Sequence, residues 1–143
     1  MSKKSAILVI FQIITMIYLI IFNNPFAINL GLVFQVLGII IGSWGILTMR
    51  IGNFNIQPEI KSEILMKSGP YRWIRNPMYT GVILIYLPII IYNFSWLNCV
   101  VFVVLLVTLL LKMISEEQFL EQRFGVDYLL YKKTTKRLIP FIF

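Results

Sequence analysis

The stretch from Met78 to Leu111 contains no charged residue, and this feature constrains the fold more than any other. A helix of about 20 residues crosses the hydrocarbon core of a bilayer, so this stretch is too long for one membrane helix. Asn93 and Ser95, in the segment YNFS, supply turn residues near its middle. We therefore predict two membrane helices, over residues 78–92 and 95–114, of which the first is short and contains Pro88.

Two further apolar segments precede this pair. Residues 6–22 are interrupted only by Gln12 and Thr15, and residues 26–49 carry no charge, which predicts helices over 5–22 and 26–49. The composition agrees, because 59% of the 143 residues are hydrophobic and only 13% are charged, against about 25% charged in soluble domains. The predicted fold is all-α: one polytopic membrane domain with about four transmembrane helices, a loop over 50–77 and a helical tail over 115–143.

The basic residues are distributed unevenly. The net charge is +7, yet the connections 23–25 and 92–95 contain no Lys or Arg. An excess of basic residues on one side of the helices is typical of the cytoplasmic side of a membrane protein. The pattern predicts a multi-pass protein of the cell membrane with both termini and the 50–77 loop in the cytoplasm. It explains the basicity through the lipid bilayer and gives no support to a nucleic-acid partner.

The N-terminal segment also resembles a signal peptide, since Lys3 and Lys4 precede its apolar run. No small-residue cleavage site follows the run, so a retained helix is favoured. The chain has no histidine and a single cysteine, Cys99. These counts exclude His-based nucleophile systems and zinc sites built from His or paired Cys, and we expect no metal. The dinucleotide and P-loop glycine motifs are also missing, which excludes a soluble Rossmann-type enzyme.

The segment GPYRWIRNPMYTG at residues 69–81 is polar and rigid although it leads into membrane. Asn76 precedes Pro77 and suits the cap of a helix that begins there. A helix N-terminus beside Arg72 and Arg75 predicts an anion-binding site. Gly81, one turn into the helix, leaves room for close approach to the backbone. The alternative is that the two arginines only reach toward lipid headgroups.

The tail holds the second polar cluster. Glu116 and Glu117 stand at the membrane boundary, where carboxylates are expensive without a cationic partner. The alternative is that both are solvated and pair with Lys112 or Arg123. Gly125 predicts the end of the fourth helix, and Asp127 predicts the cap of a short amphipathic helix that carries Tyr128 and Tyr131. Upstream, the glycines of the second helix lie on one face that predicts close helix packing or, alternatively, a groove for a lipid-like tail: Gly31, Gly38, Gly42 and Gly45.

Both clusters resemble signatures of one superfamily. Residues 69–81 are similar to the Gly-Pro-Tyr-Arg-x-x-Arg-His-Pro-x-Tyr-x-Gly signature of the isoprenylcysteine carboxyl methyltransferases and phospholipid methyltransferases. The resemblance extends from Arg50 to Pro140, and its second signature is found at Glu116-Glu117, Phe124-Gly125, Tyr128, Tyr131, Arg137 and Ile139-Pro140. Asn76 stands where the family most often has His and cannot titrate near neutral pH. The Gly-x-Gly of the eukaryotic phosphatidylethanolamine enzymes is missing.

The resemblance implies an integral membrane methyltransferase that binds S-adenosylmethionine in a cytoplasm-facing pocket and methylates a membrane-associated or lipid-like acceptor. The acceptor class stays open among an isoprenylcysteine-type carboxylate, a phospholipid amine and a thiol. The alternatives are an NADPH-dependent membrane reductase related to the sterol reductases and a non-enzymatic membrane adaptor. The resemblance implies catalytic roles for Arg75, Asn76 and Arg137, and cofactor contacts for Tyr71, Arg72, Asn76, Tyr79, Gly81, Glu116, Glu117, Tyr128 and Tyr131.

Overall fold

A computed structural model describes residues 3–52 and 65–139 of the chain. Within these ranges it contains five α-helices, one 3-10 turn and no β-strand, so the all-α prediction is confirmed. The elements are α1 (Lys3–Ile21), α2 (Leu30–Gly52), η1 (Gly69–Arg72), α3 (Pro77–Tyr92), α4 (Trp96–Phe124) and α5 (Val126–Thr134). Residues 53–64 of the predicted loop, and Pro140 with the rest of the C-terminus, lie outside the described residues.

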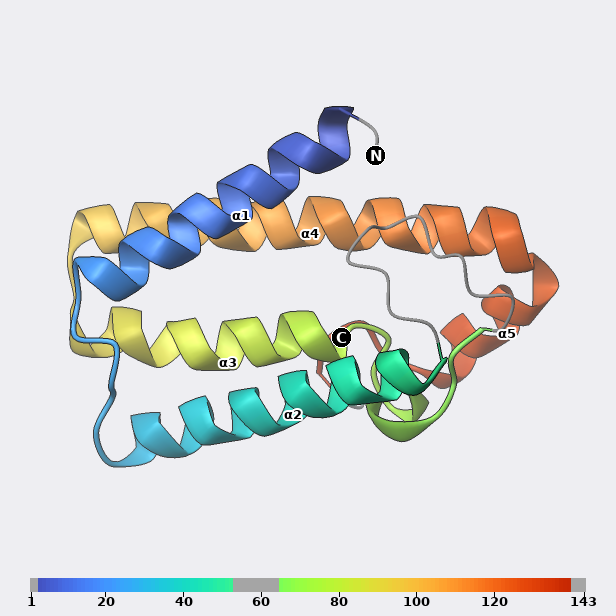
Figure 1. Ribbon diagram of the computed structural model, residues 1–143, viewed down its shortest axis with the longest axis horizontal. Helices are drawn as coiled ribbons and strands as arrows, with labels where there is room; N and C mark the ends of the chain where they lie inside the picture. The colour runs from blue at the N-terminus through green and yellow to red at the C-terminus, as the bar shows by residue number, and fades with distance from the viewer. Residues whose placement is uncertain (1–2, 53–64, 140–143) are drawn as a thin grey trace.

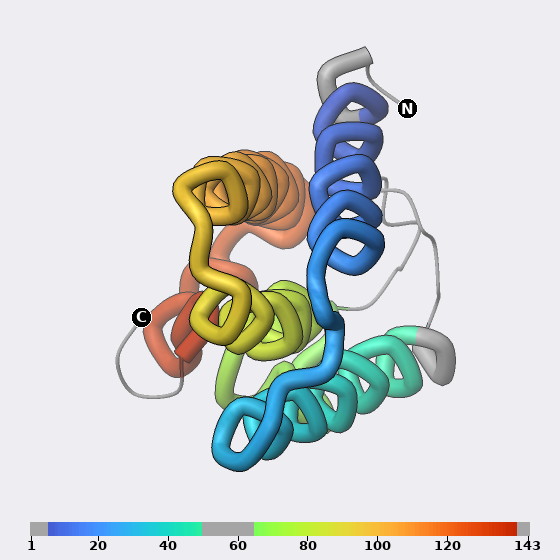
Figure 2. Tube along the Cα trace, turned by 90° about the vertical axis from the view of Figure 1, so that its left-hand side faces the viewer, coloured from blue at the N-terminus to red at the C-terminus, as the bar shows by residue number. Residues whose placement is uncertain are grey.

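The four longer helices lie side by side, and α5 turns back at one end of the bundle (Figure 1). Viewed along the bundle, α3 lies in the middle, with α2 on one side and α1 and α4 on the other (Figure 2). α2 and α4 contain segments long and apolar enough to cross a membrane, while the apolar parts of α1 and α3 are shorter. Apolar side chains cover the outside of the bundle, among them Ile14, Ile39, Leu97 and Val100.

Small residues let α2 and α3 approach closely. A Cβ atom on Gly81 would lie 2.7 Å from the carbonyl oxygen of Gly38 and 3.0 Å from the backbone of Gly42. Gly45 faces Pro77 in the same way. The packing interpretation of the glycine face is therefore confirmed. The space beside Gly81, expected to admit a ligand, is filled by the backbone of α2.

Helix α2 begins at Leu30, so the predicted start at residue 26 was wrong. The Gln35 side chain holds the preceding residues in a loop: its Oε1 accepts from the Ala27 N–H at 2.9 Å, and its Nε2 donates to the Pro25 carbonyl at 2.7 Å. Asn29, with a φ of 51°, turns the chain immediately before the helix.

Helix α4 continues without a break to Phe124, past residue 114, where its membrane-spanning part was predicted to end. Gly125, with a φ of 51°, ends α4 as predicted and also caps α5. Asp127 is therefore not the cap; it lies in the first turn of α5.

Amide side chains join the two loops at the other end of the bundle. Asn98 Nδ2 donates to Asn23 Oδ1 at 2.6 Å, and Asn93 Nδ2 donates to the Asn24 carbonyl at 3.1 Å. The break expected at 92–95 falls between α3 and α4. These bonds place the α1–α2 and α3–α4 connections at the same end of the molecule.

Candidate functional site

The chain leading into α3 and the chain leaving α5 run alongside each other. Ile74 and Lys136 form a parallel bridge, in which the Arg75 N–H donates to the Lys136 carbonyl at 2.7 Å and the Lys136 N–H donates to the Trp73 carbonyl at 3.1 Å. Neither segment is helical here, because the first lies before α3, which begins at Pro77, and the second follows α5, which ends at Thr134. We call residues 135–138, which lie across the start of α3, the C-terminal strap.

Asn76 is the N-cap of α3, as predicted, but its side chain makes no cap hydrogen bond. Its backbone N–H and its Nδ2 instead donate to the Arg137 carbonyl, at 3.1 and 3.3 Å. Thr80, one turn further along, donates through its hydroxyl to the Leu138 carbonyl at 2.8 Å. Carbonyls of the strap thus occupy donors of Asn76 and Thr80 at the start of α3.

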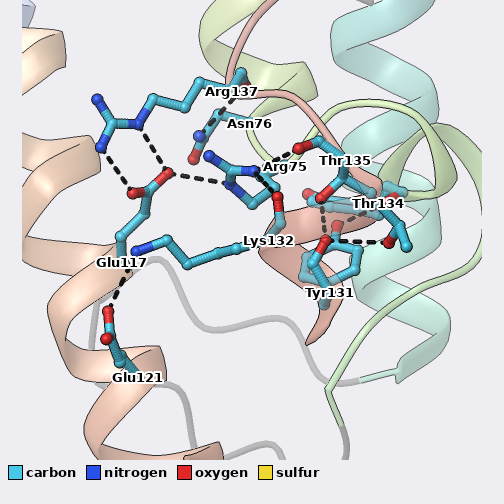
Figure 3. Close-up of polar contacts among 10 residues, drawn as sticks. Arg75, Asn76, Glu117, Glu121, Tyr131, Lys132, Thr134, Thr135 and Arg137 are labelled. Carbon is cyan, nitrogen blue, oxygen red and sulfur yellow. Dashed lines mark hydrogen bonds and ion pairs between the residues drawn. The ribbon is translucent and has the colours of Figure 1, made fainter. Parts of the chain in front are cut away.

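Glu117 joins the two clusters of the sequence. Its side chain is 6% exposed and accepts from Arg75 Nε at 3.1 Å and from both Nε and Nη2 of Arg137, at 3.2 and 3.1 Å (Figure 3). A buried charge needs a hydrogen-bonded partner of opposite charge, and the two guanidinium groups supply it for this carboxylate. The expectation that Glu117 meets cations is confirmed, and the solvated alternative is wrong for this residue.

The guanidinium group of Arg75 makes its hydrogen bonds inside the protein. Besides Glu117, its Nη1 donates to the carbonyls of Thr135 at 2.6 Å and Lys132 at 3.2 Å (Figure 3). Arg72 differs, because it lies exposed at the end of η1 and its side chain has no hydrogen-bond or ion-pair partner within residues 3–52 and 65–139. Of the two arginines expected to bind an anion, Arg72 is the one left accessible.

Glu116 faces away from this cluster, because successive helical residues point about 100° apart. Its Oε1 accepts a 2.6 Å hydrogen bond from the hydroxyl of Tyr79, a side chain on α3 that is only 6% exposed. The ammonium of Lys112 lies 5.4 Å from the centroid of the Tyr79 ring. Glu116 therefore has a neutral hydrogen-bond partner, with the cation Lys112 one helical turn away, whereas Glu117 is bonded directly to two cations.

The remaining tyrosines of the two signatures are buried. The Tyr131 hydroxyl donates to the Tyr71 carbonyl at 2.6 Å, which ties α5 to η1. Tyr128 is fully buried, and its hydroxyl has no hydrogen-bond partner among the described residues. Burial raises the pKa of Tyr128 above its ordinary value, and the carboxylate of Glu117 raises this pKa further, so the hydroxyl keeps its proton.

Within residues 3–52 and 65–139, the structure thus links the expected site residues of the two signatures at one end of the bundle, whereas Gly81 packs against α2. Sequence reasoning missed Thr80 and Thr135, whose only signal was their position next to predicted site residues. It also missed the contact between Gln12 and Lys112, at 2.8 Å. Both residues are visible in the sequence as polar interruptions of apolar runs, but nothing local pairs them.

The fold defines a class of protein: a helical bundle with apolar outer surfaces and a polar cluster at one end. Residues 26–127 match the family model described as phospholipid methyltransferase. The chain belongs to this family of membrane methyltransferases. Comparison with curated proteins and with solved structures finds no match.

Proposed function

We propose that this protein transfers a methyl group from S-adenosylmethionine to a lipid-like acceptor at the cytoplasmic end of a four-helix membrane bundle. The observation that carries the proposal is the joining of the two signatures through Glu117, in a chain that belongs to a methyltransferase family. Residues more than 40 positions apart in the sequence meet there, at the end of the apolar bundle. When bound, S-adenosylmethionine supplies an electrophilic methyl group, whose C–S bond breaks as the bond to the acceptor forms and a neutral thioether is left.

The polar groups of the site fit this cofactor. A sulfonium and an ammonium need an anionic partner, and Glu116 offers a carboxylate that is hydrogen-bonded to a neutral tyrosine hydroxyl. The cofactor's carboxylate needs a cation, and Arg72 is exposed beside the start of α3. The unpartnered hydroxyl of Tyr128 offers a further hydrogen bond inside the same end of the bundle.

The other residues have supporting roles in this proposal. Glu117 holds Arg75 and Arg137, and these arginines and Asn76 fix the strap across the start of α3. Methyl transfer depends on positioning and on electrostatic complementarity, so a rigid wall of this kind is what the reaction requires. The Tyr79 hydroxyl donates to Glu116 and the Tyr131 hydroxyl donates to the carbonyl of Tyr71, and these tyrosines would border the adenine.

Binding measured in detergent tests the proposal. The wild-type protein should bind S-adenosylmethionine, and NADPH, a polyanion, should not bind. Glu116→Gln keeps the shape of the side chain and removes its charge, and it should weaken binding about tenfold to a hundredfold, as expected for a charge-assisted hydrogen bond. Asp127→Asn, an exposed carboxylate on α5, serves as the matched control and should bind like the wild type. Wild-type protein that ignores S-adenosylmethionine would refute the proposal.

A further inference from the structure

An apolar groove lies along the contact between α2 and α3. Its volume is about 210 Å³, and every described residue that lines it is uncharged. An apolar cavity of about 150 Å³ is enough to hold a benzene molecule, so this groove has room for a segment of a hydrocarbon chain. Most of its wall is formed by large apolar residues of the two helices: Leu30, Phe34, Leu84, Leu87, Pro88 and Ile91.

The groove is accessible from the outside of the bundle. The apolar side chains of Phe34, Leu87 and Ile91 line it and remain exposed. On a bundle that spans a membrane, such side chains face the hydrocarbon of the lipid. A chain dissolved in the bilayer can therefore enter the groove sideways. Because lipid hydrocarbon is as apolar as a leucine side chain, the shape of the groove and its packing contacts must select the occupant.

One face of α3 connects the groove to the C-terminal strap. Residues three or four positions apart lie on the same face of a helix, so Thr80, Leu84, Leu87 and Ile91 form one stripe. The strap contacts the first of these residues, since the Thr80 hydroxyl donates to the Leu138 carbonyl, and the other three line the groove. At 1.5 Å per residue, the groove extends from about 6 Å to about 16 Å beyond Thr80 along the helix axis.

We propose that this groove holds the apolar chain of the lipid-like acceptor, whose headgroup then lies beside the strap. The inference rests on the proposed function, because it identifies the part of the acceptor that the bundle recognises. One leaflet contributes about 15 Å of the roughly 30 Å hydrocarbon core, so a chain as long as an ordinary phospholipid tail reaches the far end of the groove. There Gly31 packs against the ring of Tyr92. The substrate class is therefore an amphiphile with a long chain, and a chain of half this length would leave most of the groove unfilled.

Photo-crosslinking by position along the chain tests the inference. The full-length protein in phosphatidylcholine nanodiscs is incubated with sixteen-carbon probes that carry a diazirine either near the headgroup or near the chain end. Probes with a carboxylate, an amine and a thiol headgroup cover the acceptor classes left open. With at least one headgroup, the chain-end diazirine should label the groove, and the other should label the strap or the start of α3. Excess unlabelled sixteen-carbon compound should remove most of the groove label, and an eight-carbon compound should not.

Leu87→Trp should fill the groove and abolish the label that the unlabelled chain competes for. Phe34→Trp, on the α2 side, is the second variant and should have the same effect. Val100→Trp, at an exposed apolar position on α4, is the matched control and should leave the label unchanged. Label spread evenly over exposed apolar positions such as Ile39, without competition, would assign the groove to bulk bilayer lipid and overturn the inference. Groove label that survives in both groove variants would also overturn it.

Binding of S-adenosylmethionine is measured on the same samples, so the two proposals fail separately. Cofactor binding without a groove label that the long chain competes for would overturn this inference alone. A competed groove label without cofactor binding would refute the proposed function, and with it the identity of the occupant as a methyl acceptor. Cofactor binding that persists in Leu87→Trp shows that this variant is folded.

Discussion

At the scale of single residues, two adjacent glutamates have different surroundings. Glu117 is buried and held by Arg75 and Arg137, while Glu116 points to the hydroxyl of Tyr79. The sequence predicts that cations meet this pair, because charge at a membrane boundary needs compensation. It does not predict which arginines do so, because Arg75 lies 42 positions from Glu117 along the chain and Arg137 lies 20.

Replacing Glu117 by Gln should destabilise the protein by about 3 kcal/mol, because Arg75 would stay buried without its counter-ion. Thermal unfolding in detergent measures this change. Glu121→Gln is the control: its ion pair with Lys132, at 3.1 Å, is partly exposed, so its loss should cost less than about 1 kcal/mol. Equal shifts in the unfolding temperature for the two variants would show that the Glu117 cluster does not hold the fold.

The hydroxyl of Tyr128 gives a second prediction at this scale. Without cofactor, Tyr128→Phe removes a buried group that lacks a partner, so it should raise the free energy of unfolding by about 1 kcal/mol. Tyr131→Phe is the matched variant. It removes the 2.6 Å bond to the Tyr71 carbonyl and should lower the free energy of unfolding by about 1 kcal/mol. Chemical denaturation of both variants checks the signs, and a destabilised Tyr128→Phe would contradict the prediction.

At the scale of the elements, local sequence patterns predicted the packing face of α2 and the start of α3, but they did not predict features that depend on contacts between distant residues. The glycine face of α2 follows from the spacing of its residues, and the start of α3 follows from Asn76-Pro77. The start of α2 depends instead on the side chain of Gln35, eight residues beyond its partner Ala27. The strap depends on a bridge between Ile74 and Lys136, and no local pattern signals a pairing across that separation.

The α2–α3 contact can be tested with two glycines that differ in their surroundings. Gly81→Ala would place a Cβ atom 2.7 Å from the Gly38 carbonyl, where only a shift of the backbone relieves the clash. We expect a loss of about 1–3 kcal/mol, as for overpacking in a core. Gly42→Ala meets its nearest atom at 3.9 Å and should be neutral or stabilising, because alanine favours helix. A well-folded Gly81→Ala protein of unchanged stability would mean that the helices are further apart.

At the scale of the whole molecule, the bundle has two polar ends and an apolar middle. Aromatic side chains mark both ends: Trp44 packs edge-on against Trp73 near the site, and Phe94 against Trp96 at the opposite end. Aromatic residues concentrate at membrane–water interfaces, so this arrangement is the one we expect if the helices cross a bilayer along the length of the bundle. α3 has 16 residues and a length of about 24 Å at 1.5 Å per residue, less than the hydrocarbon core of about 30 Å.

Because α3 is short, the placement of Asn93 decides between a spanning and a re-entrant helix. The Asn93 side chain donates to the Asn24 carbonyl, so we expect the two loops to share one side of the membrane. Neither loop contains a basic residue, and the opposite end of the bundle carries Lys67, Arg72 and the lysines of α5. We therefore expect a reporter fused after Asn93 to be extracytoplasmic and one fused after Ser68 to be cytoplasmic. A fusion after Asn24 should agree with the Asn93 fusion, and the three reporters together fix the orientation. A cytoplasmic signal at Asn93 would contradict the four-helix topology, since the helices on either side of that loop would then return to the side on which they began.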